Sequence, residues 1–123
     1  MTRLLHPRPG QQAEDWAERH LQAHGLQRLA RNWRCRYGEL DLVMLEGDTV
    51  VFAEVRYRLH AGWGGALGSV DGRKQARVVT AAAHFLQENS QWAEHPCRFD
   101  IVAIEGTDPR ALGLTWLKDA FTS

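Results

Sequence analysis

The chain has 123 residues, of which 44% are hydrophobic and 24% are charged, a composition typical of one soluble globular domain. Its 15 basic and 15 acidic residues give a formal net charge of zero, which excludes a strongly basic protein that coats nucleic acid. No apolar run approaches the roughly 20 residues of a membrane helix, and the N-terminal run is too short for a signal peptide. We therefore expect a cytoplasmic protein with no membrane partner. Cys35 and Cys97 lack metal-ligand spacing and are expected to be reduced thiols.

The first part of the chain is predicted to contain a tail, a helix and a strand. Residues 1–9 are basic and contain two prolines, so we expect a flexible tail before a single domain of residues 10–123. Apolar side chains at helical spacing predict a helix from Gln11 to His24, and Gly25 is a typical stop. The segment from Leu26 to Arg36 is predicted to form the first strand.

An acidic β-hairpin is predicted in the middle of the chain. Its strands are GELDLV (residues 38–43) and VFAEVRYR (residues 51–58). The polar break between them has Gly47 and Asp48 at its centre, which is typical of a two-residue hairpin turn. The turn length sets the register, because a turn longer by one residue would break the face-to-face pairing.

This register brings acidic side chains together. Counting back from the turn places Asp41 opposite Glu54, and Glu39 opposite Arg56. Opposed side chains have Cβ atoms roughly 5 Å apart, where two carboxylates repel unless a cation, a proton or a strong donor joins them. The residues of the other parity are apolar and are expected to cover the other face: Leu40, Leu42, Ala53 and Val55. The alternative is an ordinary solvated acidic face, but the two-faced pattern favours a divalent-metal site.

The rest of the chain is predicted to form a loop, a helix and two strands. The loop from Leu59 to Ser69 is rich in glycine, and its Trp63 either anchors the loop or stacks on an exposed base. A helix is predicted from Asp71 to Glu88, a strand from Arg98 to Glu105, and a last short strand from Leu112 to Leu117. The α-β-β-β-α-β order predicts an α/β fold with a central mixed sheet of four to five strands flanked by helices.

Carboxylates on neighbouring strands suit phosphodiester cleavage. A divalent ion such as Mg²⁺ or Mn²⁺ neutralises phosphate oxygens and activates water, and Mg²⁺ prefers carboxylate and water ligands. Asp41 and Glu54 are the candidate ligands, and the carbonyl of Val55 is a candidate third. Arg56 points to the same face by strand parity, and its guanidinium matches the geometry of phosphate.

These motifs together resemble a known protein family. The matching segments are residues 10–14, Arg31-Asn32, GELDL at 38–42, FAEVRYR at 52–58, Lys74-Gln75, Arg98-Phe99-Asp100 and WLKDAF at 116–121. They are similar to those of the YraN family of mostly uncharacterised bacterial proteins, and they cover nearly the whole chain. That family resembles the restriction-endonuclease-like superfamily, whose sites read D…(D/E)-x-K, and especially the archaeal Holliday junction resolvases.

The resemblance implies a restriction-endonuclease-like core, DNA as the partner and metal-binding roles for Asp41 and Glu54. It also implies an auxiliary acidic role for Glu14 on the first helix. Arg56 occupies the position of the superfamily's catalytic lysine, and arginine stays charged, so it only binds or polarises. Lys74 is either a substitute for that lysine or an ordinary solvated side chain. A resolvase-like protein that cuts both strands of a junction is expected to act as a homodimer.

Several further residues are predicted to support nucleic-acid binding. The candidate phosphate-binding residues are basic and comprise Arg56, Arg58, Arg73, Lys74 and Arg77. Glu39 is predicted to position Arg56 through an ion pair, and Gln75 is a supporting residue of the family motif. The leading hypothesis is a metal-dependent endonuclease-like protein that binds and cleaves structured or branched DNA. The alternatives are a catalytically inactive nucleic-acid-binding module and an adaptor that keeps the nuclease fold.

Overall fold

The computed structural model describes residues 9–58, 68–106 and 113–123. The elements in chain order are α1 (Pro9–Ala23), β1 (Gln27–Cys35), β2 (Gly38–Glu46), β3 (Thr49–Arg58), α3 (Gly72–Glu88), the 3₁₀ helix η2 (Ser90–Trp92), β4 (Cys97–Glu105) and β5 (Gly113–Phe121). This order confirms the predicted α/β class. Helix α1 begins at Pro9, inside the predicted tail, and residues 1–8 and Trp63 of the glycine-rich loop lie outside the described residues.

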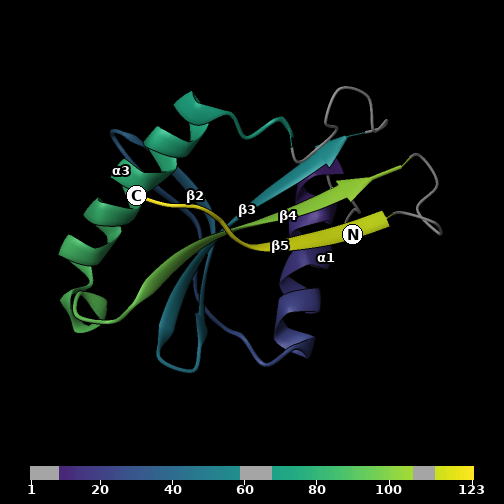
Figure 1. Cartoon of the computed structure of the whole chain (residues 1–123). Helices are drawn as coiled ribbons and strands as arrows, with labels where there is room; N and C mark the ends of the chain where they lie inside the picture. The colour runs from purple at the N-terminus through teal and green to yellow at the C-terminus, as the bar shows by residue number, and fades with distance from the viewer. Residues whose placement is uncertain (1–8, 59–67, 107–112) are drawn as a thin grey trace, which may run out of the picture.

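The five strands form one mixed sheet in the order β1-β2-β3-β4-β5. Strands β3 and β4 are parallel, and the other three neighbouring pairs are antiparallel. Helix α3 lies in the connection between β3 and β4, as a parallel pair requires a long crossover. Figure 1 shows α1 and α3 on opposite faces of the sheet, which confirms the predicted layers.

Helix α1 packs through residues spaced by one turn. Ala13, Ala17 and Leu21 recur at intervals of four residues and are buried against the sheet. The helix ends where Gly25 takes a φ of +93° and the Leu26 N–H donates to the Leu21 carbonyl at 3.1 Å. This is the Schellman arrangement, in which glycine supplies the left-handed residue that ends the helix.

Helix α3 covers the opposite face of the sheet. Asp71 caps its first turn, because the Asp71 side chain accepts the Lys74 main-chain N–H at 3.0 Å. Val78 and Phe85, two turns apart, are buried, and the Phe85 ring packs edge-on against Phe52 of β3. The helix therefore sits over the centre of the sheet, with its first turn beside the strands that carry the acidic residues.

One predicted detail of the hairpin was wrong. Leu40 and Leu42 were expected to share a face, but Leu40 packs in the core under α3, and Leu42 packs in the core under α1. The alternation breaks between them, at Asp41. The neighbouring register places Asn32 of β1 across from this point, and Asn32 has a left-handed φ of +52°. The irregularity therefore coincides with one of the predicted acidic site residues.

A buried ionic network ties β5 to the sheet. The fully buried Asp100 carboxylate accepts hydrogen bonds from Arg98, from the Trp116 Nε1–H at 2.9 Å and from the Asp119 main-chain N–H at 2.9 Å. Arg98 also pairs with Glu46 of β2. Strand β5 runs from Gly113 to Phe121, so it is longer than the predicted short strand. Within the described segments, no helix combines the length and apolarity needed to cross a membrane.

Candidate active site

The acidic pair lies where β2 and β3 stop pairing. The observed register confirms the predicted one from Glu46 opposite Thr49 to Leu42 opposite Ala53, where the ladder ends. Beyond that pair, carboxylates replace the main-chain carbonyls as hydrogen-bond acceptors. The Val55 N–H donates to Asp41 Oδ2 at 2.8 Å.

A hydrogen bond between the main chain of Asp41 and the side chain of Glu54 also links the two residues. The Asp41 main-chain N–H donates to Glu54 Oε2 at 3.3 Å. The two strands thus separate around a pair of carboxylates that are held by main-chain groups.

Burial makes this pair electrostatically unusual. Glu54 is 1% exposed and Asp41 is 7% exposed. Burial, followed by the adjacent Asp41 charge, raises the pKa of Glu54 to about 8. Burial also raises the pKa of Asp41, and the Val55 N–H and Arg56 oppose that rise. The pair therefore retains a proton near neutral pH, and binding of a cation would displace that proton.

Arg56 forms an ion pair with Glu54, but two of its donor atoms have no hydrogen-bond partner among the described residues. Its Nη2 lies 3.5 Å from Glu54 Oε1, an ion-pair distance. The buried Nε and Nη2 atoms have no hydrogen-bond partner among the described residues. Because buried donors in native proteins are normally paired, these atoms fit an additional anionic oxygen, such as one of a phosphate.

The predicted ion pair between Glu39 and Arg56 was wrong. The Glu39 carboxylate instead accepts from Arg34 Nε at 2.7 Å, and Arg34 is its direct cross-strand partner on β1. The reason is geometric. At the level of Glu39, β2 still pairs with β1 but no longer pairs with β3.

The donor set fits a hard divalent ion held by two carboxylates. Glu14 of α1 lies near enough for its charge to add to the rise of the Asp41 pKa, of which burial is the main cause. Its carboxylate, however, lies 3.4 Å from Arg31 Nη2. Across residues 9–58, 68–106 and 113–123, no three Asp, Glu, His or Cys side chains form a group that could hold a metal. Mg²⁺ is commonly bound through one or two carboxylates while it keeps several waters, so Asp41 and Glu54 suffice.

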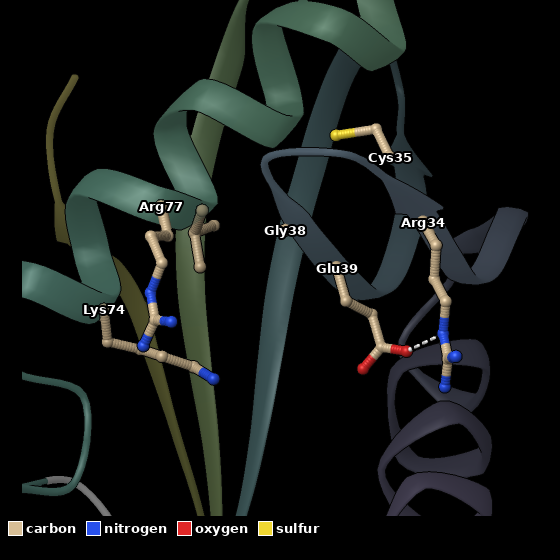
Figure 2. Close-up of a pocket in the computed structure, with 7 residues that line it drawn as sticks. Arg34, Cys35, Gly38, Glu39, Lys74 and Arg77 are labelled. Carbon is tan, nitrogen blue, oxygen red and sulfur yellow. Dashed lines mark hydrogen bonds and ion pairs between the residues drawn. The ribbon is translucent and has the colours of Figure 1, made fainter.

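A pocket of about 340 Å³ lies between the start of α3 and the β1–β2 turn. We call it the α3 pocket, and its lining residues are Arg34, Cys35, Gly38, Glu39, Lys74, Arg77 and Val78. Figure 2 shows Lys74 and Arg77 on the α3 side and the Glu39–Arg34 ion pair on the strand side.

The α3 pocket adjoins the acidic pair. Burial dominates the raised pKa of Glu54, and the charge of Lys74 opposes it. Burial likewise dominates the raised pKa of Asp41, and the charge of Glu39 adds to it. Both pocket residues are therefore close enough to the acids to act on them electrostatically.

The remaining predicted residues do not line the α3 pocket. Arg58 is exposed at the end of β3, and Arg73 is exposed in the first turn of α3, outside the pocket lining. Gln75 Nε2 donates to the Val70 carbonyl at 3.1 Å, so Gln75 holds the entry to α3. Sequence reasoning missed Arg34. The feature that identifies Arg34 is its cross-strand position opposite Glu39, which depends on the pairing of β1 with β2.

The fold defines an α/β protein, and its layers are consistent with a nuclease-like core. A mixed five-stranded sheet lies between two helices, and a buried acidic pair occupies the fork between two of its strands.

Comparison with known proteins identifies the family. The sequence model of "Uncharacterised protein family UPF0102" matches residues 13–104, and the chain belongs to this family, which confirms the predicted YraN relationship. Similar proteins include the UPF0102 protein of Pseudomonas fluorescens, 61% identical over 114 residues that cover 93% of both chains. A UPF0102 protein of Pseudomonas putida is 64% identical over 114 residues, again 93% of both chains. The UPF0102 protein of Pseudomonas savastanoi pv. phaseolicola is 58% identical over 123 residues, the whole of both chains.

Proposed function

We propose that this protein is a metal-dependent endonuclease-like protein that binds and cleaves structured or branched DNA. The observation that carries the proposal is the buried, directly joined pair of Asp41 and Glu54, which a cation would stabilise. Structural acidic residues in cores are usually neutralised by basic partners, as Asp100 is by Arg98. At the acidic pair, the only basic side chain in ion-pair contact among the described residues is Arg56, at 3.5 Å from Glu54.

Each residue of the site has a separate role in this proposal. Asp41 and Glu54 would hold a Mg²⁺ or Mn²⁺ ion. When bound, such an ion supplies charge neutralisation at the phosphate and a water of lowered pKa. Arg56 would bind a nonbridging phosphate oxygen through Nε and Nη2, which have no hydrogen-bond partner among the described residues. Because guanidinium stays protonated, Arg56 binds and polarises the phosphate but transfers no proton.

Basic side chains around the acids would position the DNA backbone. Lys74 and Arg77 line the α3 pocket, and Arg58 and Arg73 are exposed. Since the formal net charge is zero, this binding relies on a local patch and on the bridging ion. Cutting both strands of a junction would require two copies of the site, which a homodimer provides. The free cysteines fit a reducing compartment such as the cytoplasm.

A cleavage assay tests the proposal. Purified protein is incubated with labelled four-way junctions and Mg²⁺ or Mn²⁺, and products are resolved on denaturing gels. Asp41→Asn removes one ligand charge, and Asp48→Asn makes the same change on an exposed residue at the turn of the same hairpin. We expect cleavage by the wild type and Asp48→Asn, and none by Asp41→Asn. Cleavage that survives Asp41→Asn would exclude this site.

Arg56 favours a second candidate function. A site without the superfamily's lysine lacks that proton donor, so in this alternative the fold retains DNA binding without cleavage chemistry. The second candidate is therefore a noncatalytic nucleic-acid-binding module. Saturable junction binding without turnover in Mg²⁺ and Mn²⁺ would favour this module, and metal-dependent turnover would exclude it.

A further inference from the structure

The side chains that line the α3 pocket carry a net positive charge, which suits an anion. It contains three basic side chains, Arg34, Lys74 and Arg77, and one acidic side chain, Glu39. Figure 2 shows that Lys74 and Arg77 lie across the opening from Glu39, whose carboxylate is already paired with Arg34 at 2.7 Å. The two cations of α3 are thus the surplus positive charge of the pocket. A phosphate group matches that surplus.

The pocket is larger and less polar than a phosphate alone requires. Its volume of about 340 Å³ is at the lower end of the roughly 300–1,000 Å³ that is usual for small-molecule sites. Cys35, Gly38 and Val78 supply uncharged lining beside the cations. One nucleotide, with its phosphate, sugar and base, suits this combination of size and lining. A base within a duplex would first have to leave its stack and its partner.

A stacked aromatic pair, of which Tyr37 is exposed, extends the same surface. Tyr37 is 45% exposed, and its ring stacks on His84 of α3 with centroids 4.5 Å apart. Within the described segments, the exposed large hydrophobic side chains are Tyr37 and Leu117. His84 follows Arg77 by seven residues, which places both on one face of α3. Cations followed by an exposed aromatic ring are typical of surfaces that bind single-stranded nucleic acid.

We infer that the α3 pocket accepts one unpaired nucleotide of the bound strand, next to the phosphate at Asp41 and Glu54. The preferred substrate is therefore DNA with a single-stranded segment at the site, such as a flap or a splayed junction arm, rather than continuous duplex. The inference rests on the proposed function, because the acidic pair sets which phosphate lies beside the pocket. It adds a substrate class that the acidic pair alone does not specify.

Cys35 permits a test that does not depend on cleavage. It lines the pocket, and Cys97 is the other cysteine of the chain, so a Cys97→Ser protein has one reactive thiol. Its alkylation by iodoacetamide is followed by mass spectrometry in EDTA, with oligothymidylate, a blunt duplex of the same length, or inorganic phosphate. At about ten times the dissociation constant, mass action predicts that oligothymidylate slows alkylation about tenfold. Duplex and inorganic phosphate should leave the rate unchanged.

Two exposed arginines provide matched variants. Arg77 of α3 lines the pocket, whereas Arg19 lies on α1, across the sheet from the pocket. Arg77→Ala should weaken oligothymidylate binding about tenfold, the effect of losing one hydrogen bond to a charged group. At the same strand concentration it should also lose most of the Cys35 protection, whereas Arg19→Ala should keep it.

The possible outcomes separate this inference from the proposed function. Protection by oligothymidylate and not by duplex supports the pocket, even if no junction is ever cleaved. Equal protection by duplex, protection by inorganic phosphate alone, or a bound strand that leaves Cys35 reactive would overturn it. A failure of oligothymidylate to bind would overturn it as well. Cleavage of junctions by a protein whose Cys35 stays reactive would contradict the pocket and leave the proposed function standing.

Discussion

The main-chain N–H of Asp41 donates to the Glu54 carboxylate at 3.3 Å, so the two acids are held together at the fork between β2 and β3. The Asp41 carboxylate is in turn fixed by the Val55 N–H. Because main-chain groups anchor both carboxylates, their positions depend little on side-chain flexibility. Such preorganisation is what a metal-binding pair requires.

Glu54→Gln should stabilise the protein at alkaline pH. The folded-state pKa of Glu54, about 8, lies above its ordinary value of 4.5. The protonated carboxyl of Glu54 therefore makes its full contribution to stability below its ordinary pKa. This contribution is lost as the pH rises through about 8. Glutamine stays neutral and keeps an acceptor for the Asp41 N–H. We expect a gain on the order of 2 kcal/mol in the free energy of unfolding at about pH 9, and little change at about pH 5.

Urea denaturation at both pH values measures this effect. The control is Glu94→Gln, which makes the same change on an exposed residue and should behave as the wild type. Parallel losses of stability by Glu54→Gln and the wild type at alkaline pH would contradict the raised pKa.

Mn²⁺ should bind more tightly as the pH rises. The ion must displace the proton that the Asp41–Glu54 pair retains, so its apparent affinity should increase by up to about tenfold per pH unit below the pKa of Glu54. Calorimetry in buffers of different ionisation enthalpy should detect about one proton released per ion. Asp48→Asn should bind Mn²⁺ as the wild type does. A pH-independent affinity without proton release would speak against the pair as the ligand.

Arg56→Lys should increase junction cleavage. Lysine retains the positive charge beside Glu54 and adds a group that can transfer a proton. Since general acid–base catalysis contributes about 10²–10⁴-fold, we expect a rate gain of at least about tenfold at similar junction affinity. Single-turnover assays with saturating protein measure the rate. Arg56→Met keeps an unbranched side chain without the charge, and it should bind the junction more weakly. A lysine variant no faster than the wild type would refute this role.

Asp100→Asn should be destabilising without affecting the metal site. Its carboxylate is fully buried and paired with Arg98, so the change removes a charge-assisted acceptor and leaves Glu46 as the acidic partner of Arg98, at a cost of about 1–3 kcal/mol. Asp41→Asn should show the reverse: a small change in stability and loss of Mn²⁺ binding. Chemical denaturation and Mn²⁺ titration of both variants, at a temperature where both are folded, check the contrast. Loss of Mn²⁺ binding by folded Asp100→Asn would contradict it.

The hairpin could be predicted from the sequence because its information is local. A two-residue turn at Gly47 and Asp48 and the alternating strands were enough to set the register from Glu46 opposite Thr49 to Leu42 opposite Ala53. The extrapolation beyond Leu42 failed for Glu39, because the ladder to β3 ends there and β1 supplies the partner. Where two strands separate depends on all three strands together, and no local pattern encodes it.

The α3 pocket could be predicted only in part. The sequence indicated a basic patch of Arg73, Lys74 and Arg77, with positions 73 and 77 on one helix face, and of these three Lys74 and Arg77 line the pocket. The opposite wall could not be predicted, because it depends on the docking of α3 against the β1–β2 turn. That docking is close at Gly38, where an added Cβ would lie 3.5 Å from the Arg77 carbonyl oxygen.

A crystal structure of the protein soaked in Mn²⁺, with anomalous diffraction data, tests the central claim most directly. The account predicts one strong anomalous peak between the carboxylates of Asp41 and Glu54, within roughly 2.0–2.3 Å of an oxygen atom of each. A fully occupied peak elsewhere, or no peak at this pair at saturating Mn²⁺, would contradict it.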